Sequence, residues 1–203
     1  MSRRESSSTD RTRRQVPARG RQIEPRRNRR WLWGVAALAL LAVVAVAVML
    51  LNRGSTTLTG VETFSDLAQT HVETKVDYPQ APPVGGAHNG RWQNCGIYDQ
   101  PIENEYGVHS LEHGAVWITY RPDLPVEDVT RIQSIARGQP FVLVSPYPDL
   151  PSPVVASAWG TQLKLASVDT AQLSAFIQQY ERGPQTLEPG ASCRSGVGNP
   201  IAR

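Results

Sequence analysis

The sequence predicts a small α+β domain that follows a single amino-terminal transmembrane helix. Three patterns lead to this fold class: an uncharged apolar run at residues 31–51, a period-two alternation at residues 116–120, and an apolar stripe at residues 173–180. The first has the length of a membrane span, the second is typical of a half-buried strand, and the third is typical of an amphipathic helix. Residues 61–203 are expected to form one compact domain, because this length is sufficient for a hydrophobic core.

Residues 31–51, WLWGVAALALLAVVAVAVMLL, are expected to cross the plasma membrane. A helix rises about 1.5 Å per residue, so this run spans the roughly 30 Å of hydrocarbon. Residues 1–30 carry eleven arginines against three acidic residues, and positive charge stays on the cytoplasmic side. A cleaved signal peptide is the competing interpretation, but its apolar region measures only about 7 to 15 residues. We therefore expect a single-pass protein with a cytoplasmic amino terminus and an extracytoplasmic carboxyl-terminal domain.

The basic tail at residues 1–30 contains almost no large apolar residues and is expected to be disordered. Its expected contact is anionic lipid rather than nucleic acid. Residues 31–203 carry ten basic residues against fifteen acidic ones, and this negative balance argues against a nucleic-acid partner for the outer domain. Residues 52–60 are expected to be a linker.

Residues 61–107 are expected to form a long, ordered, irregular loop region, because Pro, Gly, Asn and aromatic residues recur in it. Regular elements follow this region. A strand is predicted at residues 116–120, and a helix at 126–137 that starts after Pro125 and ends before Gly138.

Further elements complete the α+β pattern. Residues 140–146 and 153–159 read as β-rich runs, and residues 162–167 as a third. The last helix begins after Asp169, whose side chain is a good cap, and the pair Gly183-Pro184 ends it.

Two cysteines occur, Cys95 and Cys193, and both lie outside the membrane in the predicted topology. In an oxidising compartment they are expected to form a disulfide that ties the carboxyl-terminal tail to the irregular region. Metal ligation or redox chemistry by Cys95 is the alternative, although the chain has no C-x-x-C motif.

All four histidines fall between residues 71 and 113, and Glu112 lies among them. Imidazole and carboxylate groups are ligands for zinc, copper and similar ions. The spacing of His109 and His113 would place both rings on one face of a helix. The sequence therefore predicts a metal site whose candidate ligands are His71, His88, His109, Glu112 and His113.

A structural role for the string HSLEH is the competing interpretation. The string matches the H-x-x-E-H pattern of inverted zinc proteases, but Gly107 and Gly114 bracket it and a strand pattern follows, which leaves less than two helical turns. In that case Glu112 accepts backbone N–H bonds, and Gly114 supplies a positive φ before the strand. Gly85-Gly86 is expected to be a plain turn rather than a phosphate loop. No serine stands in a hydrolase motif, and no small-molecule substrate is identifiable.

The strings APPVGGAHNGRWQNCGIYDQP and VHSLEHGAVWITYRPDLP resemble the bacterial family catalogued as domain of unknown function 3105. The resemblance covers most of residues 60–182, and PPVGGxH and HSLEHGAV are its specific strings. It implies an envelope protein, commonly with one amino-terminal span, and brings no established activity or ligand. The matching positions are Pro82, Pro83, Gly85, Gly86, His88, Trp92, Cys95, Gly96, Tyr98, Glu105, His109, Glu112, His113 and Gly114.

Two functions of different classes follow from these observations. The first is a membrane-anchored domain that captures zinc or copper through converging histidines. The second is a metal-free module that binds another envelope protein and uses the same residues for structural hydrogen bonds. A metal-dependent hydrolase, with Glu112 or Glu105 as base, is a third and weaker hypothesis.

Overall fold

The computed structural model describes residues 29–51 and 56–203, and within the first helix it describes the side chains of residues 31–47. The chain divides into two units, residues 1–53 and residues 54–203. The predicted basic tail, apart from its last two residues, and the first part of the predicted linker lie outside the described residues.

The described residues of the first unit form the helix α1 (Arg29–Leu51), which includes the predicted membrane span at residues 31–51. Among the residues that the structure describes, no helix is long and apolar enough to cross a membrane. The predicted transmembrane span and the membrane location stay predictions.

The second unit is built on a six-stranded mixed sheet with the strand order β1-β6-β5-β3-β4-β2. One of its two central strands, β3 (Val116–Tyr120), runs parallel to β4 (Val142–Pro146) and antiparallel to the other central strand, β5 (Val154–Ala158). The helix α3 (Val126–Ala136) connects the two parallel strands, as such a crossover requires. The remaining strands are β1 (Val61–Thr63), β2 (Gly96–Ile97) and β6 (Thr161–Leu165).

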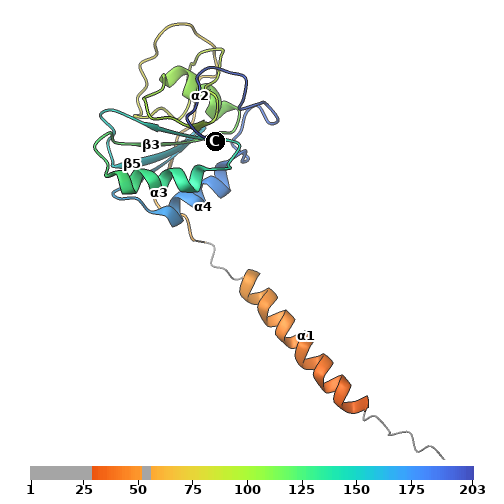
Figure 1. The fold of residues 1–203 in the computed structure, drawn as a ribbon. Helices are drawn as coiled ribbons and strands as arrows, with labels where there is room; N and C mark the ends of the chain where they lie inside the picture. The colour runs from red at the N-terminus through yellow and green to blue at the C-terminus, as the bar shows by residue number, and fades with distance from the viewer. Residues whose placement is uncertain (1–28, 52–55) are drawn as a thin grey trace, which may run out of the picture. The chain divides into compact units, whose positions relative to one another are not determined.

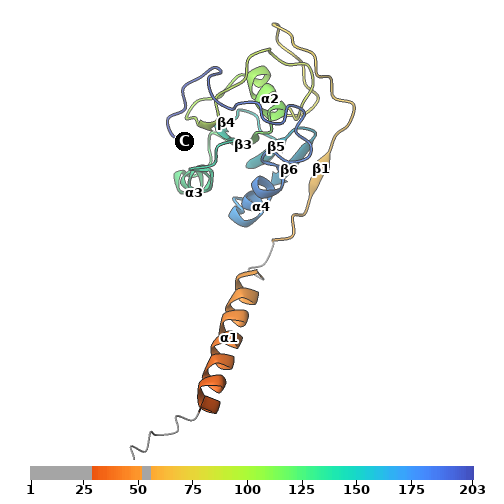
Figure 2. The same cartoon turned by 90° about the vertical axis from the view of Figure 1, so that its right-hand side faces the viewer.

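Each face of this sheet is covered by different parts of the chain (Figures 1 and 2). The helices α3 and α4 (Thr170–Tyr180) cover one face, whereas α2 (Asn104–Glu112) and the irregular segments cover the other. Alternate residues of β3 point to opposite faces, so Ile118 packs in the core beneath α3 and α4 while Trp117 packs in the core beneath α2. The fold is therefore α+β, as predicted.

The predicted strand at residues 116–120 is confirmed, but its expected half-burial is wrong. All five of its residues are buried, because β3 lies inside the sheet and both sheet faces are covered. The predicted last helix is also confirmed: the Asp169 carboxylate accepts the backbone N–H groups of Ala171 and Gln172, both at 3.0 Å. This is the capping contact expected from the sequence.

The irregular segment is more regular than the sequence predicts, because it contributes the edge strands β1 and β2 and the first residues of α2. The carboxyl-terminal tail returns to the sheet edge formed by β2. Ile97 N–H donates to the carbonyl of Ala202, and Ile201 N–H donates to the carbonyl of Ile97, both at 2.8 Å. Cys95 and Cys193 form the predicted disulfide, with Cα atoms 5.4 Å apart.

Candidate metal centre

The helix α2 carries two of the five predicted ligands, His109 and Glu112, near its carboxyl-terminal end, and His113 follows as the capping residue. The helix is longer than the sequence suggests. It begins at Asn104, so Gly107 lies inside the helix rather than before it. A Cβ atom on Gly107 would lie 2.8 Å from Cζ3 of Trp117, which shows that the glycine admits the indole ring of β3. Gly114 has a φ of +96° and ends the helix, as expected.

Three histidines are oriented by the same contact, a hydrogen bond from Nδ1 to a backbone carbonyl. His88 Nδ1 donates to Gly86 at 2.8 Å, His109 Nδ1 to Asn89 at 2.6 Å, and His113 Nδ1 to Ser192 at 2.7 Å. A carbonyl oxygen only accepts, so each Nδ1 carries the proton, and a neutral ring then presents a lone pair at Nε2. Metal-binding histidines are commonly fixed in this way by their second nitrogen.

Four of the predicted ligands converge: His71, His88, His109 and Glu112. Each offers one ligand atom, and these atoms all lie within 4.8 Å of one another. Tetrahedral zinc with bonds of about 2.05 Å needs ligand atoms about 3.3 Å apart, so a separation of 4.8 Å would shorten by about 1.5 Å, and the 2.9 Å between His88 Nε2 and Glu112 Oε2 would lengthen slightly. We call these four residues the first position.

The backbone holds two of these histidines together. The strand-like segments around His71 and His88 form a parallel β-bridge, in which Val72 N–H donates to the carbonyl of His88 at 2.7 Å and His88 N–H donates to the carbonyl of Thr70 at 3.0 Å. The ring of His71 also stacks on that of His109 with centroids 5.0 Å apart. The His71 side chain is 52% exposed, whereas the other three ligands are buried.

Both ring nitrogens of His88 face oxygen acceptors. Its Nδ1 donates to the Gly86 carbonyl, and its Nε2 lies 2.9 Å from Oε2 of Glu112. His88 is fully buried and Glu112 is 4% exposed, so a lone pair against a carboxylate would be strongly unfavourable there. The contact between these two atoms therefore needs either a proton, carried by the ring or by the carboxyl group, or a metal ion.

His113 does not join this group but belongs to a second one. Its Nε2 lies 3.2 Å from Oε2 of Glu188, and His109, His113 and Glu188 place their ligand atoms within 4.8 Å of one another. His109 is shared by both groups. We call these three residues the second position.

The buried ring of His109 is held neutral. Desolvation lowers the pKa of His109 to about 4, and the neighbouring histidines lower it further, while the hydrogen bond to Asn89 opposes the shift. At pH 7 its Nε2 is therefore unprotonated and able to bind a cation. Its Nε2 has no hydrogen-bond partner within residues 56–203.

The carboxyl-terminal segment holds the second position against α2. The backbone N–H groups of Leu187 and Glu188 both donate to the carbonyl of Glu112 at 3.2 Å. Ser192, which orients His113, precedes the disulfide-bonded Cys193. The disulfide thus fixes the chain segment that completes this end of the cluster.

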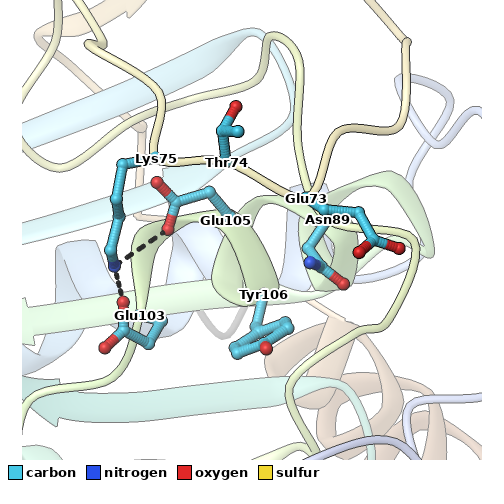
Figure 3. Close-up of a pocket in the computed structure, with 7 residues that line it drawn as sticks. All are labelled: Glu73, Thr74, Lys75, Asn89, Glu103, Glu105 and Tyr106. Carbon is cyan, nitrogen blue, oxygen red and sulfur yellow. Dashed lines mark hydrogen bonds and ion pairs between the residues drawn. The ribbon is translucent and has the colours of Figure 1, made fainter.

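A pocket of about 290 Å³ lies beside the cluster and is shown in Figure 3. Lys75 pairs there with Glu103 and with the buried carboxylate of Glu105, and Asn89, whose carbonyl orients His109, also lines the pocket. None of the five predicted ligands lines it. Its walls carry three glutamates against one lysine, so the pocket favours a polar or cationic occupant.

The ligand set predicted from the sequence contains every residue of the first position and groups His113 with them, but it does not contain Glu188. The structure separates His113 and pairs it with Glu188, 75 positions later in the chain. The only sequence signal for this pairing is indirect. Glu188 lies five residues before Cys193, whose disulfide partner Cys95 is close in sequence to His88.

Comparison with known proteins gives one match. The family described as "Protein of unknown function (DUF3105)" matches residues 71–195, a stretch that contains all four histidines, both cysteines and Glu188. No curated protein and no solved structure matches the chain. Because the match covers more than half of the chain, the protein belongs to the DUF3105 family.

Proposed function

We propose that this domain binds one transition-metal ion, Zn²⁺ or Cu²⁺, through His71, His88, His109 and Glu112. The observation that carries the proposal is the convergence of four ligand atoms within 4.8 Å, two of them on buried rings whose Nδ1 protons are committed to backbone carbonyls. Three imidazoles and one carboxylate suit both ions.

The buried acceptor pair gives a second, independent reason. An ion bound by His88 Nε2 and Glu112 Oε2 would supply positive charge at this buried pair, in place of the proton that the two groups otherwise share. The metal-free alternative keeps that proton and uses the pair as a structural ion pair. The two alternatives therefore differ in a measurable quantity, the metal content of the folded protein.

The number of ligands favours binding over hydrolysis. Zinc sites that activate water use three protein ligands and leave one position open, whereas four protein ligands close the site. His71 is the exposed ligand, so it is the one whose departure would open the coordination sphere. The role that we propose for the domain is therefore that of a metal sensor, carrier or store.

We also propose that residues 31–51 anchor the domain to a bilayer, with the domain outside the cytoplasm. The apolar run of α1 and the eleven arginines before residue 31 support this location, and the disulfide is typical of an oxidising compartment. The test is extraction of cell membranes with alkaline carbonate. An anchored chain stays in the pellet, and release into the supernatant would contradict the proposal.

The metal proposal is tested by elemental analysis of the full-length chain, purified without a histidine tag in mild detergent and offered each ion before desalting. Wild type is expected to retain close to one ion per chain. His109→Gln is expected to retain none, because the central imidazole ligand is lost. Glu127→Gln, an exposed carboxylate change on α3, is the matched control and is expected to behave as wild type.

Circular dichroism and the unfolding midpoint of each variant show whether the fold is kept. A folded wild type that retains neither ion would refute the metal proposal. In that case the histidines would serve the fold alone, and an interaction module would be the better description of the domain.

A further inference from the structure

We infer that the cluster has a second, overlapping metal position formed by His109, His113 and Glu188, and that one ion moves between the two positions through His109. The inference rests on the proposed function and adds a path for the ion. The ligand class is the same, a divalent transition-metal ion.

The two positions share a single lone pair. His109 Nδ1 donates to Asn89, so only its Nε2 is available, and both groups of ligand atoms include His109. One nitrogen lone pair binds one ion, and the two positions therefore exclude each other. The expected stoichiometry is one ion per chain, although the described residues contain two sets of ligands.

The second position repeats the arrangement of the first. In each, a buried histidine donates Nδ1–H to a carbonyl and directs Nε2 at a carboxylate oxygen: His88 at Glu112 with 2.9 Å, and His113 at Glu188 with 3.2 Å. The His109 ring lies between them, with ring centroids 5.0 Å from His88 and 4.6 Å from His113. An ion leaving one pair thus stays near His109 while it reaches the other.

The positions differ in burial and in ligand number. The Glu112 side chain is 6% exposed, whereas that of Glu188 is 51% exposed. The second position also has three ligands rather than four. It is therefore the weaker and more accessible of the two, which suits the position where an ion from solution first binds.

Rigid contacts keep the two positions adjacent. Leu187 and Glu188 are hydrogen-bonded through their backbone N–H groups to the carbonyl of Glu112, and Ser192 is held next to the Cys95–Cys193 disulfide. The Trp92 ring packs on His113 with centroids 4.8 Å apart. The carboxylate of Glu188 is the part of this assembly that faces solvent and is free to attract a cation.

The test uses Co²⁺ as a spectroscopic probe for Zn²⁺, with the full-length chain in mild detergent. The proteins are wild type, Glu112→Gln, Glu188→Gln, the double variant, and Glu127→Gln as control. Stoichiometry comes from elemental analysis, affinity from Zn²⁺ competition, and loading rates from stopped-flow measurement of the Co²⁺ visible bands.

Wild type is expected to bind one Co²⁺. Glu188→Gln is expected to bind one Co²⁺ with nearly unchanged affinity but to load at least about tenfold more slowly, because the exposed carboxylate no longer attracts the ion. Glu112→Gln is expected to bind one Co²⁺ roughly 10- to 100-fold more weakly, with a changed visible spectrum from the second position. The double variant is expected to lose binding.

The outcomes separate the two proposals. No ion in folded wild type would refute the proposed function. One ion in wild type but none in folded Glu112→Gln would leave the proposed function intact and overturn the second position. Two ions per wild-type chain, or a wild-type loading rate in Glu188→Gln, would also overturn the shared, sequential arrangement.

Discussion

Acidification is expected to destabilise the metal-free domain through one buried ring, that of His109. Burial lowers the pKa of His109 to about 4 in the folded protein, whereas an unfolded chain has the ordinary value of 6.5. Between these values the unfolded chain binds a proton that the folded chain does not. The contribution of the neutral His109 ring to the free energy of unfolding is therefore fully present above pH 6.5 and is lost as the pH falls towards 4.

The magnitude follows from the size of the shift. The folded and unfolded pKa values differ by about 2.5, which lowers the free energy of unfolding by about 3.4 kcal/mol at a pH where the ring is protonated in both the folded and the unfolded chain. At pH 5 the free energy of unfolding has already fallen by about 2 kcal/mol. With a urea slope of about 2 kcal/mol/M, the unfolding midpoint is expected to fall by about 1 M between pH 7.5 and pH 5 from this group alone.

The assay is urea unfolding followed by tryptophan fluorescence at several pH values, with chelator present so that no metal contributes. His109→Gln is expected to lose less stability than wild type on acidification, by about 2 kcal/mol at pH 5. His71→Gln, which changes an exposed ring of the same cluster, is expected to keep most of the wild-type slope. Parallel loss of stability in wild type and His109→Gln would refute the assignment to this ring.

Three further changes test the fold around the site, each by urea unfolding. Gly107→Ala is expected to cost about 1 to 3 kcal/mol, because its Cβ would lie 2.8 Å from the Trp117 ring; an unchanged midpoint would mean that this contact relaxes freely. Asp169→Ala is expected to cost about 1 kcal/mol through loss of the cap on α4, with Asp169→Asn as the variant that retains it. Replacing both Cys95 and Cys193 by Ser is expected to cost about 4 to 5 kcal/mol, since the disulfide closes a loop with a sequence separation of 98; reductant should then destabilise wild type but leave the variant unaffected.

The regular half of the domain follows from local sequence patterns. Asp169 caps α4, Pro125 precedes α3, and the alternation at residues 116–120 gives β3. These signals act within one turn or one strand, so they need no knowledge of the rest of the chain. The burial of both faces of β3 was missed because it depends on which distant segments cover the sheet.

The structure of the irregular half depends on tertiary contacts, which local sequence patterns do not reveal. The strand β2 has two residues and exists because Gly96 and Ile97 pair with Leu143 and Val144. The glycine at position 107 predicted a boundary, but it lies inside α2 because the Trp117 ring occupies the space of its missing side chain. In both cases a tertiary contact overrides the local preference.

The candidate site likewise contains residues that local sequence signals predict and one residue, Glu188, that they do not. The clustering of four histidines within residues 71–113 pointed to the candidate ligands of the first position, because imidazole groups bind transition metals and a local excess of them is the sequence signal for such a site. Glu188 has no such signal, since its distance from His113 depends on the returning tail and on the Cys95–Cys193 disulfide. The disulfide thus brings a segment that is remote in sequence, including Glu188, close to the histidine cluster.

The hydrogen bonds of the cluster do not by themselves favour the metal-free alternative. Every bond from Nδ1 to a carbonyl stabilises the fold whether or not an ion is present, and such bonds also fix the rings of metal ligands. The metal-bound and metal-free alternatives differ in what they require of the second ring nitrogen, Nε2. In His88 and His113 this nitrogen lies next to a carboxylate, that of Glu112 and of Glu188 respectively. Nε2 of His109 is paired with neither of these carboxylates. The neutral His109 ring lies between the two His–Glu pairs and suits a ligand shared by both proposed metal positions, and the metal content of the folded protein decides between the alternatives.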